Sequence, residues 1–205
     1  SKPEIILASS SPRRREFLDR LGLPCRVLHP NVDERGRGAK SPAEYALRNA
    51  VDKARQIAAG LAVRDKRHGS RRVVVAADTI VVLDNRILEK PSDRPHARAM
   101  LRALSGRRHQ VITGLCILGV GYPEGQREKS LTVSTDVEFK KLTDAEIDAY
   151  VATGEPMDKA GAYAVQGIGS FMVRSVHGSY TNVVGLPLCE MMDILEKDFE
   201  YPVFS

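Results

Sequence analysis

The sequence predicts an α/β fold in which helices flank a mixed, twisted sheet. Short apolar runs typical of strands alternate with segments whose apolar residues keep helical spacing. Glycine is dense in the C-terminal third, where short strand-like runs between turns indicate antiparallel pairs beside parallel ones. The 205 residues, of which 42% are hydrophobic, can bury a full core as one large domain or two small lobes.

The chain opens with the pattern of a strand, a polar turn and a helix. Residues 5–8 form an apolar run that stops at three consecutive serines. Ser11 before Pro12 predicts a helix N-cap followed by proline at the first helical position, and Gly22 predicts the end of that helix.

A long helix and a buried strand are predicted next. Ser41 and Glu44 form a capping-box pattern, and apolar residues keep helical spacing to about Gly60. The basic residues 64–72 predict a solvated loop. Residues 73–83 form a nearly continuous apolar run, as in a strand buried on both faces. The remaining predictions are helices at 92–104, 143–154 and 188–199, and strands at 87–88, 111–118, 131–139, 162–165, 171–176 and 180–184.

Composition sets limits on the class of protein. The formal net charge of +5 favours polyanionic ligands without choosing among nucleotides, nucleic acid and anionic lipid. Three widely separated cysteines suit reduced thiols in the cytoplasm. No apolar run reaches the roughly 20 residues of a membrane span, and the first residues lack a signal-peptide pattern. We therefore expect a soluble, cytoplasmic protein.

The serine turn before the first helix is a candidate anion site. A helix N-terminus presents free backbone N–H groups and a positive dipole end. Arg13 and Arg14 in the first turn oppose the dipole preference for acidic residues, and a phosphate bound by both would explain their presence. A capped surface helix with two solvated arginines explains the pattern about equally well.

Asp78 and Thr79 interrupt the apolar run at residues 73–83. A carboxylate on a buried strand is costly unless it is paired, bound to a metal or catalytic. Asp78 could hold a divalent cation or take a proton from attacking water. A cap or turn residue is the other reading, and the apolar run that continues past Asp78 argues against it.

Other segments carry weaker signals. Pro91 fixes the chain after Glu89-Lys90, which could hold the ammonium toward a phosphate, although the pattern taken alone favours a solvated lysine beside a turn. Lys53 lies near the apolar face of the second helix, as snorkelling lysines do. The glycine-rich residues 158–167 allow close backbone approach to a flat ligand, and Gln166 could pair with a base edge. A structural glycine loop is the alternative.

Six segments, taken in order, resemble the Maf family of nucleotide pyrophosphatases. These segments are residues 9–14, 77–79, 89–91, 105–107, 158–167 and 178–187, which together span nearly the whole chain. The resemblance implies one Maf-like domain over residues 1–205, elongated and two-lobed with a central cleft, and related to the inosine triphosphate pyrophosphatases. It also implies cleavage between the α- and β-phosphates, a divalent cation such as Mg²⁺ or Mn²⁺, and a homodimer.

The resemblance also assigns site residues. The essential aspartate of the family falls on Asp78, as proton acceptor or metal ligand. Glu34 matches an acidic cleft residue and is, with Asp78, a candidate metal ligand, to which we add Glu89. The residues that match substrate-binding positions are Ser9, Arg13, Arg14, Lys53, Thr79, Lys90 and Gln166, of which Arg13, Thr79 and Gln166 match positions that set base preference.

Three hypotheses follow. The form of residues 158–167 resembles the branch of the family that acts on dTTP and UTP, with clearance of noncanonical nucleotides as a family-level purpose. The first alternative is the same chemistry on a modified guanine nucleotide such as 7-methyl-GTP. The second is a nucleic-acid-binding regulator of cell division without turnover, which the net charge suggests and the scattered basic residues argue against. We expect no stable nucleic-acid partner.

Overall fold

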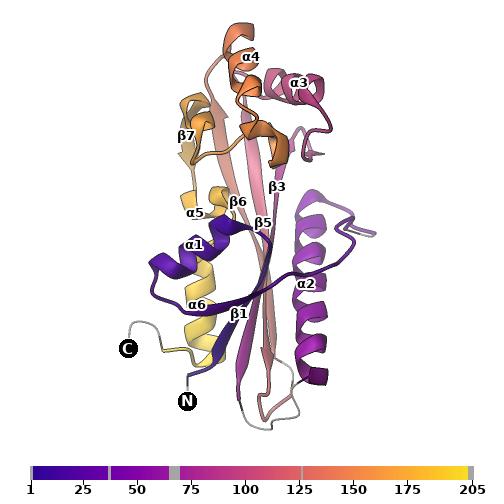
Figure 1. Ribbon diagram of the computed structural model, residues 1–205, viewed down its shortest axis with the longest axis vertical. Coiled ribbons are helices and arrows are strands. Elements are labelled where there is room, and N and C mark those ends of the chain that lie inside the picture. Colours follow the sequence, from indigo (N-terminus) through magenta and orange to yellow (C-terminus); the bar gives the residue numbers. More distant parts are fainter. Residues whose placement is uncertain (1, 37, 65–69, 126, 203–205) are drawn as a thin grey trace. The chain divides into compact units, whose positions relative to one another are not determined.

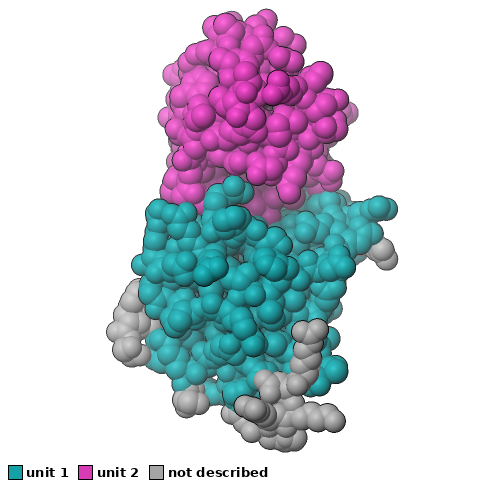
Figure 2. Space-filling view, viewed as in Figure 1, with its two compact units in different colours: residues 1–78, 113–133, 185–205 teal, residues 79–112, 134–184 magenta. Residues whose placement is uncertain are grey.

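The computed structural model describes residues 2–36, 38–64, 70–125 and 127–202 (Figure 1). The chain forms two compact units, which Figure 2 distinguishes by colour. Unit 1 comprises residues 1–78, 113–133 and 185–205, and unit 2 comprises residues 79–112 and 134–184. The single domain with a central cleft stays a prediction.

Within the described residues, seven strands form one mixed sheet in the order β2-β1-β3-β5-β6-β7, with β4 paired to β3. Strand β1 runs parallel to β2 and β3, whereas β3 is antiparallel to β4 and β6 is antiparallel to β7. The predicted mixed sheet is therefore confirmed. The strands are β1 (Glu4–Ala8), β2 (Cys25–Leu28), β3 (Arg72–Leu83), β4 (Arg86–Leu88), β5 (Arg108–Val120), β6 (Glu128–Phe139) and β7 (Val173–His177).

Unit 1 is built on α2 (Pro42–Arg64), which packs its small apolar residues against the sheet. Buried alanines recur every fourth position along the helix, at Ala46, Ala50, Ala54 and Ala58. A Cβ atom on Gly114 of β5 would lie 2.4 Å from the backbone oxygen of Ala46, so the helix backbone rests almost directly on the strand. The other helices of unit 1 are α1 (Pro12–Arg20) and α6 (Leu188–Phe199).

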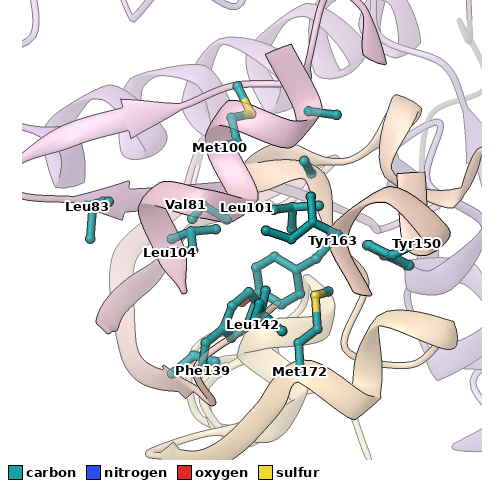
Figure 3. Close-up of a cluster of buried hydrophobic side chains, with 14 of the residues drawn as sticks. Val81, Leu83, Met100, Leu101, Leu104, Phe139, Leu142, Tyr150, Tyr163 and Met172 are labelled. Atoms are coloured by element: carbon teal, nitrogen blue, oxygen red, sulfur yellow. The ribbon is translucent and has the colours of Figure 1, made fainter. Parts of the chain in front are cut away.

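Unit 2 encloses a second core, shown in Figure 3. Strand residues such as Val81 and Phe139 pack with Leu101 and Leu104 of α3 and with Tyr150 of α4. Thr143 and Glu146 form the predicted capping box at the start of α4. The elements of this unit besides its strands are α3 (Arg94–Leu104), α4 (Asp144–Ala152), η1 (Glu155–Asp158), η2 (Ala160–Ala162), η3 (Ile168–Met172) and α5 (Tyr180–Val184).

Two predicted strands in the glycine-rich third are wrong, and a third is only partly right. Ala162 is the last residue of the 3₁₀ helix η2, and residues 163–165 form no strand. Gly161 and Ala162 both have positive φ, which is incompatible with an extended strand at these positions. Residues 180–184 form α5, where the Ser179 hydroxyl accepts from the backbone N–H of Asn182. That capping bond outweighs the strand preference of the valines. Of residues 171–176, only those from Val173 onward are in a strand.

The basic stretch predicted as a loop is shorter than expected, because α2 continues to Arg64 and β3 begins at Arg72. Residues 65–69 lie outside the described residues. Among the described residues, no helix combines the length and the apolar character that a membrane crossing requires.

Candidate active site

One face of α2 carries the polar side chains of the candidate site. Tyr45, Asn49 and Lys53 follow one another at intervals of four residues, which places them in a row along the helix. The row lies beside the buried alanine stripe, and the close contact at Gly114 holds the helix against the sheet. The packing that forms the core therefore also places these polar groups over β3.

The Asp78 carboxylate is nearly buried on β3 and has a partner from α2 on each oxygen. Its Oδ1 lies 2.9 Å from Lys53 Nζ, and its Oδ2 accepts a hydrogen bond from Asn49 Nδ2 at 3.0 Å. Only 9% of the Asp78 side chain and 7% of the Lys53 side chain is exposed. Lys53 is therefore buried and ion-paired, and the snorkelling alternative is wrong.

The loop that carries Glu34 is fastened to the same helix face. Glu34 Oε1 lies 3.0 Å from Lys53 Nζ, so one ammonium group contacts two carboxylates. The Tyr45 hydroxyl donates to the backbone oxygen of Glu34 at 2.6 Å, and Asn49 Oδ1 accepts from the backbone N–H of Gly36 at 3.0 Å. Asn49 therefore links the Glu34 loop to Asp78 through the two ends of its amide.

At the start of α1, residues of the predicted anion site hydrogen-bond to one another and to Gly185. The Ser9 hydroxyl accepts from the backbone N–H of Ser11 and from Arg14 Nη1, at 3.1 and 3.2 Å. Arg14 Nε donates to the backbone oxygen of Gly185 at 2.7 Å. Ser11 is the N-cap by position, but its side chain makes no capping bond. Arg13 is half-buried in the first turn.

The charges of these groups act on one another within unit 1. Burial lowers the pKa of the Arg14 guanidinium, while the negative charges of Asp78 and Glu34 raise it and the positive charge of Arg13 lowers it further. Arg14 therefore lies within electrostatic range of both carboxylates that contact Lys53. Two cations and two carboxylates converge in this unit.

The fit of a divalent cation depends on the oxygen donors available. Asp78 and Glu34 both contact Lys53 Nζ, so their carboxylates are close neighbours. No cluster of three or more His, Cys, Asp and Glu side chains that could hold a metal occurs in the part of the chain that the structure describes. Mg²⁺ is usually held by one or two carboxylates together with water and substrate phosphates, so this pair fits such an ion.

Four predicted residues lie in unit 2. Glu89 and Lys90 are exposed after β4, and the backbone oxygen of Glu89 accepts from the backbone N–H of Gly161 at 3.2 Å. This bond ties the Glu89-Lys90 segment to the glycine-rich residues 158–167. Gln166 is exposed in a turn of that segment, and Thr79 is half-buried on β3.

Two buried or half-buried polar residues are absent from the sequence predictions. Asn49 is 1% exposed, and its position directly beside the alanine stripe of α2 is a signal that could have identified it. Glu155 accepts hydrogen bonds from Tyr150 and from two backbone amides. Because those amides lie 13 and 14 residues away, no local pattern identifies Glu155.

Comparison with known proteins gives close relatives over nearly the full length. A dTTP/UTP pyrophosphatase of Anaeromyxobacter dehalogenans (strain 2CP-C) is 49% identical over 195 residues, covering 95% of this chain and 94% of the relative. The dTTP/UTP pyrophosphatase of Symbiobacterium thermophilum is 46% identical, covering 98% and 97% of the two chains. That of Vibrio cholerae is 45% identical, covering 95% and 97%.

Among solved structures, the Staphylococcus aureus Ham1 protein is similar at 16% sequence identity and a TM-score of 0.47, covering 94% of this chain and 98% of that one. The family model described as Maf-like protein matches residues 4–198. With a match of that length and several relatives above 45% identity, the chain belongs to the Maf-like protein family.

Proposed function

We propose that this protein hydrolyses dTTP and UTP to the nucleoside monophosphate and pyrophosphate. The observation that carries the proposal is the convergence in unit 1 of Asp78 and Glu34 with Lys53 and Arg14. A buried carboxylate paired with an ammonium adds little net stability, and such buried charged groups concentrate at functional sites. The names of the relatives supply the reaction and the substrates.

The reaction adds water across the α–β phosphoanhydride, so one P–O bond forms, another breaks, and pyrophosphate leaves with the negative charge. A triphosphate carries three to four negative charges, which repel a nucleophile unless cations neutralise them. In our proposal, Lys53 and Arg14 supply that positive charge, with Arg13 and Lys90 as further phosphate ligands and Ser9 as a hydrogen-bond donor. Asp78 orients the attacking water and accepts its proton.

A bound Mg²⁺ or Mn²⁺ would screen the phosphate oxygens and polarise the bond that breaks. Asp78 and Glu34 are the residues of unit 1 that would hold it, and Glu89 is proposed as a further ligand that the resemblance does not assign. Lys53 contacts both of these carboxylates, so its ammonium would supply positive charge beside the metal.

Base preference is assigned to Thr79, Gln166 and Arg13. An amide offers one acceptor and two donors, which can match the polar edge of uracil or thymine. The exposed position of Gln166 in a turn leaves its amide available for such contacts. A homodimer, a cytoplasmic location and the clearance of noncanonical nucleotides are further proposals that rest on the family resemblance.

The test is a substrate panel. Purified protein is incubated with each common nucleoside triphosphate and with 7-methyl-GTP, in Mg²⁺ or Mn²⁺, and both pyrophosphate and monophosphate are measured. We expect dTTP and UTP to give the highest kcat/KM. Absence of pyrophosphate from both would refute the proposal.

Two variants assign the roles. Asp78→Asn should lower kcat by about a thousandfold, the usual scale for loss of a general base. Asp52→Asn, an exposed aspartate on the same helix as Lys53, should leave kcat unchanged. Gln166→Glu should change the order of substrates, and an unchanged order would remove Gln166 from base recognition.

The two alternative functions are not favoured. The relatives reported above are named as dTTP/UTP pyrophosphatases. Pyrophosphate release from 7-methyl-GTP but not UTP would support the first alternative, and salt-dependent retention of DNA or RNA without turnover would support the second.

A further inference from the structure

The carboxylate of Glu155 is the centre of a hydrogen-bond cluster in unit 2. Glu155 follows α4 and begins η1. Its Oε2 accepts from the Tyr150 hydroxyl at 2.7 Å and from the backbone N–H of Gly169 at 2.9 Å. Its Oε1 accepts from the backbone N–H of Ile168 at 2.9 Å. Hydrogen bonds to an ionised carboxylate are about twice as strong as neutral ones, so Glu155 holds the backbone at Ile168 and Gly169 strongly.

Tyr150 links Glu155 to the N-terminal end of the turn formed by residues 164–169. Its hydroxyl donates to Glu155 and accepts from the backbone N–H of Ala164 at 3.3 Å. Its ring is 1% exposed and belongs to the core of unit 2, where it is labelled in Figure 3. The segment from Ala164 to Gly169 is therefore tied at both ends to a pair of side chains that the core holds in place.

The backbone between these attachment points passes very close to both side chains. A Cβ atom on Gly167 would lie 1.9 Å from Glu155 Oε1, and one on Gly169 would lie 2.6 Å from the Tyr150 hydroxyl. A Cβ atom at Gly167 would therefore displace the Glu155 carboxylate, and one at Gly169 would displace the Tyr150 hydroxyl or the backbone oxygen of Ala164. Gln166 precedes Gly167 and its side chain is exposed, so a closely packed part of the backbone adjoins an accessible side chain.

We propose that Glu155, together with Tyr150, is the positioning residue that fixes Gln166 for base discrimination. This inference rests on the proposed function, in which the Gln166 amide contacts the base. An amide distinguishes one base from another only when its donor and acceptor are held in one orientation. Without the Glu155 carboxylate the turn is free at its C-terminal end, and Gln166 samples several orientations. Substrate binding weakens and discrimination falls, while the bond-breaking step is affected less.

The experiment compares Glu155→Gln and Tyr150→Phe with the control Glu146→Gln. Glu146 is a matched control because its carboxylate also accepts from a backbone N–H, that of Thr143, in the same unit. Two kinds of measurement are made on each protein: the kinetic constants kcat and KM for UTP and CTP, and amide hydrogen exchange at Ile168 and Gly169. Exchange needs no substrate, so it reports on the turn independently of activity.

In Glu155→Gln we expect exchange at both amides to accelerate about tenfold, the scale of one lost charge-assisted hydrogen bond. We also expect KM for UTP to rise about tenfold with kcat within about twofold, and the preference for UTP over CTP to fall. Tyr150→Phe should give the same changes to a smaller degree, because the two backbone amides still reach Glu155. Glu146→Gln should change neither exchange at these amides nor the preference.

Other results would overturn either the role of Glu155 or the proposed function. Faster exchange with an unchanged KM and preference would show that Glu155 only stabilises the fold, which overturns the inference, as would unchanged exchange. If Glu155→Gln does not fold, Tyr150→Phe tests the inference instead, because this variant keeps the buried ring and with it the packing of the core. If the wild-type protein releases no pyrophosphate from UTP or dTTP, the proposed function fails. If wild type is active and Gln166→Ala loses discrimination while Glu155→Gln keeps it, the present inference alone fails.

Discussion

The ammonium nitrogen of Lys53 lies 2.9 Å from Oδ1 of Asp78, and less than a tenth of either side chain is exposed. A buried ion pair contributes little net stability, because removing both charges from water costs about as much as their attraction returns. Removal of one partner alone is costly, since it leaves the other charge buried without compensation. The pair is therefore fragile toward single substitutions.

Lys53→Met should lower the free energy of unfolding by about 3 kcal/mol, because Asp78 would stay buried without its cation. Denaturant titration measures this. Lys197→Met is the matched control, since Lys197 pairs with Asp193 at 3.0 Å on the surface of α6 with 70% of its side chain exposed. That substitution should change stability by less than about 0.5 kcal/mol. Equal losses in both variants would contradict the argument.

Asn49→Leu should impair both stability and turnover. The leucine keeps the volume but leaves Asp78 Oδ2 without its donor and the Gly36 N–H without its acceptor. Each lost buried partner costs about 1 to 3 kcal/mol. We expect kcat to fall about tenfold, because Asp78 is then held on one side only. Pyrophosphate release and thermal unfolding of the same samples measure the two effects.

Asn49→Asp separates the two ends of the amide. Aspartate can still accept from the Gly36 N–H but repels Asp78, so the loop attachment survives while the contact with Asp78 does not. Its kcat should therefore fall at least as far as that of Asn49→Leu. Normal turnover in Asn49→Asp would show that the bond to Asp78 is dispensable.

Acid should weaken unit 2 through His109. Its Nε2 lies 2.8 Å from the Tyr163 hydroxyl, and burial lowers its pKa from the ordinary 6.5 to about 4 although Asp136 raises it. Between these values the unfolded chain binds a proton that the folded chain does not. The contribution of neutral His109 to the free energy of unfolding is therefore fully present above about pH 6.5. It is lost as the pH falls toward about 4, which lowers the free energy of unfolding by up to about 3 kcal/mol.

His109→Gln keeps a hydrogen-bonding group but does not titrate. The loss of unfolding free energy between about pH 7.5 and about pH 4.5 should be smaller in the variant than in the wild type, by about 2 to 3 kcal/mol. Denaturant titrations at the two pH values measure the difference. The same loss in both proteins would exclude His109 as the source of the acid sensitivity.

Gly114→Ala should destabilise unit 1, because the new methyl group would meet the backbone of α2 at 2.4 Å and neither backbone can move freely. We expect a loss of about 2 to 3 kcal/mol, typical of overpacking. Gly60→Ala is the control, since a Cβ there meets nothing within 4 Å on the exposed side of α2. That change should stabilise the helix by about 0.5 to 1 kcal/mol. Thermal unfolding distinguishes the two directions.

Long periodic segments were predictable from sequence, and so was the type of sheet. The helices at α2, α3, α4 and α6 follow apolar spacing and caps that are local in the chain. Strand β2 was not predictable, because its residues are half-buried or exposed and form no apolar run. The helix α5 was predicted as a strand, since its valines favour extended structure and only the cap at Ser179 opposes it.

The candidate site, like the fold, was predictable only in part. The apolar run through Asp78 was enough to mark that carboxylate as unusual, and the structure pairs it with two residues of α2. The hydrogen bond between Asn49 and Asp78 was not predictable. Helical periodicity shows which residues share a face of a helix, but not which strand that face packs against. Glu155 was missed for a related reason, since its donors come from a turn whose path depends on glycine conformations.

Arg14 donates to the backbone oxygen of Gly185, 171 positions later in the chain. Unit 1 includes α6, which begins at Leu188, whereas every residue of unit 2 lies within positions 79–184. During synthesis from the N-terminus, unit 2 is therefore complete while unit 1 still lacks α6 and the carbonyl that holds Arg14. Ser9 and Arg14, which are near the N-terminus, therefore reach their final environment only after Gly185 has been synthesised.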